Sequence, residues 1–179
     1  WSADEIPDNA AIICRNNAPL FTCALQLLRG GRGCQLVGSD LGPGLVKVLK
    51  KLGAENINRE QVHEAINRWE AERLRKARSE GPTRDRADCL RVFASFGNTL
   101  GGAIAYAERL FSSSGPIKLL SGHKAKGLEF DTVYFLDPWR IPSRYAVTHE
   151  QKEQEKNVEY VITTRAKDKL FLVNLEDFS

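Results

Sequence analysis

Short apolar runs and amphipathic segments alternate in the first part of the chain. The runs "AAIICR" (Ala10–Arg15) and "CQLVG" (Cys34–Gly38) are almost continuously apolar, which is typical of strands buried on both faces of a parallel sheet. Between them, residues 20–31 ("LFTCALQLLRGG") place apolar side chains at helical spacing and end at two glycines. We therefore predict a strand, a helix and a second strand.

The middle of the chain has a helical pattern throughout. A short amphipathic segment begins near Pro43, and the longer segment "NREQVHEAINRWEAERLRKAR" has apolar side chains on one face and glutamates and arginines on the other. The break "SEGPTRD" follows it, and the glycines of "GNTLGG" indicate a turn. We expect four helices here, over residues 42–52, 58–78, 85–96 and 100–111.

The last third returns to alternation. "PIKLLSG", "DTVYFLD" and "KLFLVN" have the pattern of strands, and "EQEKNVEYVITTRA" has the pattern of a helix. Strands separated by helices predict a mostly parallel α/β sheet flanked by helices. We expect one domain over residues 1–179, with a helical segment at about 58–112.

Composition narrows the class of protein. Hydrophobic residues make up 42% and charged residues 27% of the chain, as in ordinary globular domains, and no apolar run is long enough to cross a membrane. The net charge of +3 suits a nucleic acid or nucleotide, although many other domains share it. The four cysteines lack C-x-x-C or zinc spacing, so we predict buried thiols in the cytoplasm and no metal site.

One loop, "SGHKAKGLEF" (Ser121–Phe130), connects two of the predicted strands. Ligands of open α/β sheets bind beyond the carboxyl ends of strands. Histidine and lysine donate to phosphates, glycine lets the backbone approach an anion, and a carboxylate accepts from sugar hydroxyls. The loop contains all of these: Gly122, His123, Lys124, Lys126, Gly127 and Glu129. Its chemistry alone leaves open a ligand site and a solvated turn.

Two arginines have unusual positions. Arg165 is flanked by apolar residues near the end of the last helix, where it either reaches a phosphate across a cleft or pairs with Glu159 or Asp168. Arg15 closes a buried strand at its carboxyl end. We predict that three basic groups converge on one edge of the sheet to form a polyanion site: Arg15, Lys126 or His123, and Arg165.

Three segments together resemble the second motor domain of superfamily 1 DNA helicases of the UvrD/Rep type. "AIICRNNAPL" resembles their motif IV, "LLSGHKAKGLEFDTVYFLD" motif V, and "VEYVITTRAKDKLFLV" motif VI. The resemblance implies a RecA-like three-layer fold and a role in an ATP-dependent helicase of DNA repair or replication. It departs from the family at Cys14, where an aromatic residue is common, and in having only a small helical segment in place of a large accessory domain.

The resemblance also implies residue roles. Arg15 and Arg165 would contact the γ-phosphate of ATP, which is held with Mg²⁺ mainly by the N-terminal RecA-like domain of the same parent chain. Gly127 and Glu129 would meet the phosphates and the ribose. The segment of Ser121, Gly122 and His123 would contact the backbone of single-stranded DNA.

A phosphate-binding loop is absent from the sequence, since no G-x-x-x-x-G-K-[ST] occurs. The chain also lacks methionine, so we expect a fragment of a longer protein that neither hydrolyses ATP nor unwinds DNA by itself. One alternative is a non-catalytic nucleic-acid-binding or partner-docking domain. A cysteine hydrolase built on Cys14 is disfavoured because an apolar strand does not lower the pKa of a thiol.

Overall fold

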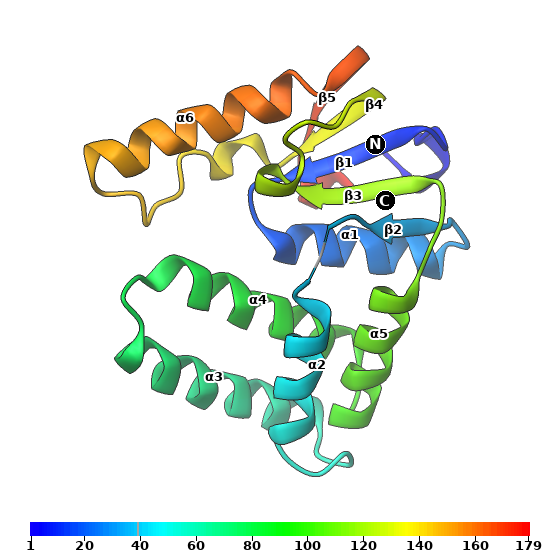
Figure 1. Cartoon of the computed structure of the whole chain (residues 1–179). Coiled ribbons are helices and arrows are strands. Elements are labelled where there is room, and N and C mark those ends of the chain that lie inside the picture. Colours follow the sequence, from blue (N-terminus) through cyan, green and yellow to red (C-terminus); the bar gives the residue numbers. More distant parts are fainter. Residues whose placement is uncertain (39) are drawn as a thin grey trace. The chain divides into compact units, whose positions relative to one another are not determined.

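The computed structural model describes residues 1–38 and 40–179 and divides the chain into two compact units (Figure 1). The first unit comprises Trp1–Gly38 and Ser113–Ser179 and contains the sheet. The second unit, Ser39–Ser112, is helical. It is longer than the expected segment 58–112 because it includes a further helix before residue 58.

The sheet of the first unit has five strands in the order β2-β3-β1-β4-β5, and all neighbouring pairs are parallel. This confirms the predicted parallel α/β class. The strands are β1 (Ala10–Cys14), β2 (Cys34–Leu36), β3 (Ile117–Ser121), β4 (Phe130–Leu136) and β5 (Ala166–Val173). The helices of this unit are α1 (Asn17–Arg29) and α6 (His149–Thr163), with 3-10 turns η1 (Ala3–Glu5), η2 (Gly122–Lys124), η3 (Pro138–Arg140) and η4 (Leu175–Asp177).

Helices cover both faces of the sheet (Figure 1). On one face, Val158 and Ile162 of α6 pack on a buried cluster that includes Ile13, Val133 and Phe135. Neighbouring strand residues point to opposite faces, and α1 contacts β1, β2 and β3. Burying each of the two α6 side chains contributes about 1.5–3 kcal/mol. The three layers are consistent with a RecA-like domain.

Strand register determines which loops share an edge of the sheet. Cys14 at the end of β1 lies opposite Ser121 of β3 and Leu136 of β4. At the other end, Phe130 of β4 lies opposite Ala166 of β5. The residues that follow β1, β3 and β4 therefore lie together beyond the carboxyl ends of the strands, a place that we call the carboxyl edge. The residues that precede β4 and β5 form the opposite, amino edge.

The second unit contains α2 (Gly42–Lys51), α3 (Arg59–Lys76), α4 (Glu80–Phe96) and α5 (Leu100–Ser112). Asn58 caps α3 in a capping box with Gln61. Helix α4 begins five residues before the predicted Asp85, because Pro82 falls in its first turn, where a missing N–H is tolerated. Pro82 therefore does not break the helix at this position.

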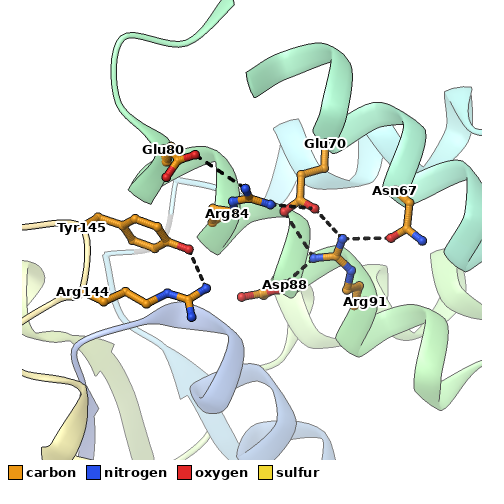
Figure 2. Close-up of polar contacts among 8 residues, drawn as sticks. All are labelled: Asn67, Glu70, Glu80, Arg84, Asp88, Arg91, Arg144 and Tyr145. Carbon is orange, nitrogen blue, oxygen red and sulfur yellow. Dashed lines mark hydrogen bonds and ion pairs between the residues drawn. The ribbon is translucent and has the colours of Figure 1, made fainter. Parts of the chain in front are cut away.

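A buried carboxylate joins α3 to α4 in this unit (Figure 2). Glu70 accepts hydrogen bonds from Arg91, the shorter at 2.7 Å, and forms an ion pair with Arg84 at 3.5 Å. The hydrogen bond to Glu70 is the main reason that the pKa of Arg91 is raised. A buried charge needs such partners, so this network holds the two helices together.

All four cysteines are buried, as predicted. Burial raises the pKa of Cys34 to about 11 and raises that of Cys23 further. Cys14 is fully buried in β1, so it has no access to a substrate. Among the described residues, no helix is long and apolar enough to span a membrane, and no group of side chains has the arrangement of a metal site.

Candidate functional site

The amino edge brings the Gly-Leu-Glu segment of the Ser121–Phe130 loop against Arg165. The backbone N–H of Phe130 donates to the carbonyl of Arg165 at 2.9 Å. In return, Nη1 of Arg165 donates to the carbonyl of Leu128, also at 2.9 Å. Gly127 and Glu129 flank Leu128 and are exposed. These two predicted site segments are therefore held together by reciprocal hydrogen bonds.

The guanidinium of Arg165 is fixed but keeps its charge available. Its Nε donates to the carbonyl of Val161 at 2.8 Å, and Nη2 donates to Oγ1 of Thr164 at 3.0 Å. All of its hydrogen-bond partners are neutral oxygens, and neither Glu159 nor Asp168 pairs with it in the part of the chain that the structure describes. A half-buried arginine without a carboxylate partner is well suited to bind an anion.

The carboxyl edge contains a different arginine, Arg15, in a tight ion pair. Its Nε donates to both carboxylate oxygens of Glu155 at 3.0 and 3.1 Å, and its Nη2 donates to one of them at 3.0 Å. Glu155 lies on α6 and is only 4% exposed. It also accepts from the backbone N–H of Ser143 at 2.6 Å. One carboxylate thus joins the end of β1, helix α6 and the loop that precedes this helix.

His123 lies beside this ion pair, in the turn η2 that follows β3. Partial burial lowers its pKa, the positive charge of Arg15 lowers it further, and Glu155 acts in the opposite direction. The lowered pKa favours the neutral imidazole, which can donate one N–H. Ser121 and Gly122 immediately precede it at the same edge.

The predicted convergence of Arg15, His123 and Arg165 on one edge is wrong. Arg15 follows Cys14, which lies opposite Leu136 at the carboxyl end of β4. Arg165 precedes Ala166, which lies opposite Phe130 at the amino end of β4. Leu136 lies six positions after Phe130 on β4, so the two levels are about 20 Å apart at a rise of roughly 3.3 Å per residue. The structure instead groups Arg15 with His123 and groups Arg165 with Gly127 and Glu129.

The Ser121–Phe130 loop connects the two edges. It leaves the carboxyl end of β3 and enters the amino end of β4, and Ala125 in its middle packs in the buried cluster under α6. At Gly122, a Cβ would lie 2.7 Å from Val158 and 2.9 Å from Ile162. Glycine is therefore required at this position for α6 to pack closely on the loop. Lys124 and Lys126 are exposed.

Several residues at the carboxyl edge were not identified from the sequence. Besides Glu155, they are Asp137, Trp139 and Arg140 in the segment after β4. For Glu155 there was a signal, because it lies three residues before Val158, on the buried side of the helix. The tight turn at Asp137 has no sequence signal other than the proline that follows it.

Comparisons with known proteins agree with the resemblance of motifs V and VI. Residues 83–177, more than half of the chain, match the model of the UvrD-like helicase C-terminal domain. A protein of Acanthamoeba polyphaga mimivirus, named as an ATP-dependent DNA helicase, is 40% identical over 58 residues, which is 32% of this chain and 8% of that protein. DNA helicase II homologues of Rickettsia conorii and Rickettsia felis are each 38% identical over 68 residues, 35% of this chain and 10% of theirs.

The matched segments span a tenth or less of the length of these relatives. The family match itself covers most of α4, helices α5 and α6, and strands β3, β4 and β5. It therefore includes the whole Ser121–Phe130 loop and Arg165. On this evidence, the chain belongs to the family of UvrD-like helicase C-terminal domains.

Proposed function

We propose that this chain is the second motor domain of an ATP-dependent DNA helicase or translocase. It would work with an N-terminal RecA-like domain of the same parent chain. The observation that carries the proposal is the amino edge, where Arg165 is hydrogen bonded to Leu128 and has no carboxylate partner among the described residues. Membership of the helicase family supports it.

The residues at this edge fit a nucleotide that is held mainly by another domain. The guanidinium of Arg165 can donate to phosphate oxygens, and the exposed carboxylate of Glu129 can accept from ribose hydroxyls. Gly127 has a φ of 83°, and a Cβ placed on it would have no atom within 4 Å, so its backbone is open to an anion. ATP bound with Mg²⁺ supplies the energy of the motor through its hydrolysis. Arg165 acts as the arginine finger that stabilises charge developing on the γ-phosphoryl group.

Arg15 has a different task in this proposal. Its resemblance to the motif IV arginine suggested a second contact to the γ-phosphate. Its ion pair with Glu155 and the separation of about 20 Å between the strand levels oppose simultaneous contact with one phosphate by Arg15 and Arg165. We assign Arg15 to organising the carboxyl edge, where its charge lies beside His123.

Single-stranded DNA is the proposed partner of the carboxyl edge. Ser121, Gly122 and His123 would contact its sugar-phosphate backbone, with the neutral imidazole donating one N–H to a phosphate. The loop that begins with these residues ends with Gly127 and Glu129 at the amino edge. A change at the nucleotide can thereby reach the DNA through one short, packed segment.

The test is Arg165→Ala in the full-length parent, with Arg165→Lys as the conservative control. We expect ATP hydrolysis to fall by about 10³-fold or more, the range for loss of an arginine finger, while binding of single-stranded DNA is retained. A non-catalytic binding or docking domain would lose no catalytic activity. The 179-residue chain alone should not turn over ATP, because it lacks the phosphate-binding loop; robust turnover by it would refute the two-domain assignment.

A further inference from the structure

The segment between β4 and α6 contains two pairs of an aromatic residue and an arginine. The guanidinium of Arg140 lies 4.6 Å from the ring centroid of Trp139, and that of Arg144 lies 5.0 Å from the ring of Tyr145. Arg144 also donates to the hydroxyl of Tyr145 (Figure 2). Trp139 is 67% exposed, although tryptophan side chains are highly buried on average. An exposed indole held under an arginine calls for a functional explanation.

Trp139 is presented by a rigid support. Asp137 is buried and has a left-handed backbone with φ 48°. One of its carboxylate oxygens accepts from the N–H of Leu175 at 2.9 Å, and the other accepts from Nε of Arg140 at 3.1 Å. Arg140 also donates to Asn16, after β1, at 3.5 Å. The guanidinium of Arg140, which packs against the indole of Trp139, is therefore held by Asp137 and Asn16.

Trp139 lies at the same edge as the proposed DNA contacts. Leu136 and Ser121 are both opposite Cys14, so the residues after β4 and β3 begin at one level on either side of β1. Two strand spacings of roughly 4.8 Å separate β4 from β3, which is about 10 Å. An indole after β4 and His123 after β3 are thus close enough to contact neighbouring parts of one extended strand.

The buried carboxylates of this edge do not oppose the binding of a polyanion. These two carboxylates, Asp137 and Glu155, are each paired with an arginine, Arg140 and Arg15 respectively. The exposed ring of Trp139 lies beside the first of these pairs. Aromatic side chains next to basic groups are the usual means of binding single-stranded nucleic acid, because every base has a π-face that can stack.

We propose that Trp139 is a base-stacking platform for single-stranded DNA at the carboxyl edge, with Arg140 as the positioning residue that holds the indole. This inference rests on the proposed function of that edge and adds a contact to a base, whereas Ser121, Gly122 and His123 would contact the backbone. Stacking on one ring carries little sequence preference. The platform therefore suits a protein that moves along DNA of any sequence.

The experiment measures binding of the intact chain to a fluorescently labelled oligo-dT by anisotropy at low salt. A second probe of equal length has an abasic phosphodiester backbone. We expect Trp139→Ala to bind oligo-dT roughly 5- to 150-fold more weakly, the range for loss of one stacked base, and Trp139→Phe to retain most of the affinity. Binding to the abasic probe should be the same for all three proteins. Tyr160→Ala is the matched control, because Tyr160 is an equally exposed aromatic residue, at 69%, on α6.

The outcomes separate the platform from the proposed function. If Trp139→Ala binds oligo-dT as tightly as the wild type, the platform is refuted while the DNA-binding edge stands. An equal loss on the abasic probe, or an equal loss in Tyr160→Ala, also overturns stacking at Trp139. If the wild-type chain binds neither probe, the proposed DNA edge fails together with the platform. Quenching of tryptophan fluorescence by oligo-dT in the wild type, and less quenching in Trp139→Phe, would support the direct contact.

Discussion

Glu155 is expected to be the residue whose loss most disturbs the carboxyl edge. Its carboxylate receives three hydrogen-bond contacts from Arg15 and one from the Ser143 N–H. Glu155→Ala removes all of them and leaves the guanidinium of Arg15 without its partner. Breaking a fully buried ion pair in this way costs about 3–5 kcal/mol. The side chain of Arg15 is 20% exposed, so water will solvate part of its charge.

We therefore expect Glu155→Ala to lower the free energy of unfolding by about 2–4 kcal/mol. Glu155→Gln should cost about 1–2 kcal/mol, since it keeps one carbonyl acceptor but loses the charge-assisted hydrogen bonds. Arg15→Met combined with Glu155→Leu should cost less than the sum of the single changes, because no charge is left unpaired. A double-mutant cycle followed by urea unfolding measures these differences.

Hydrogen exchange of the Ser143 amide measures the contact between Ser143 and Glu155 directly. In the wild type this N–H donates to Glu155, so it should be protected, and Glu155→Ala should make it exchange faster. The amide of Val133, in the central part of the sheet, serves as the control. A cost of less than about 0.5 kcal/mol for Glu155→Ala, the usual size of a surface substitution, together with unchanged exchange of Ser143, would contradict this role of Glu155.

Two further predictions concern the Ser121–Phe130 loop. The pKa of His123 should lie below 6.5 in an NMR titration. In Arg15→Met it should rise but stay below 6.5, because burial is the larger cause of its shift. Since a lowered histidine pKa means that stability is lost as the pH falls below 6.5 towards the folded-state pKa, a wild-type value at or above 6.5 would contradict the burial. Gly122→Ala should destabilise the chain by about 2–3 kcal/mol in thermal unfolding, because its Cβ would meet two α6 side chains at 2.7 and 2.9 Å. Gly127→Ala should cost about 1 kcal/mol from its positive φ alone, since its Cβ would meet no atom within 4 Å; the reverse order would contradict the packing argument.

The sequence by itself determined the local elements and the family. Continuous apolar runs predicted β1, β3 and β4, and the apolar spacing after Pro19 predicted α1, because burial and backbone period leave a direct pattern in the order of residues. The Gly-Leu-Glu and Thr-Arg-Ala segments could be recognised for the same reason, since each is contiguous. Together these patterns were enough to predict a parallel α/β domain of the helicase type.

Only the tertiary structure decided which candidate residues meet. Arg15 and Arg165 are both next to strand ends, but one follows a strand and the other precedes one, and strand order and register place them on opposite edges. Glu155 reaches Arg15 across 140 positions of sequence, and no local pattern encodes such a pair. Long-range partners depend on how strands align with each other, which is determined by the packing of the whole sheet and not by any one segment.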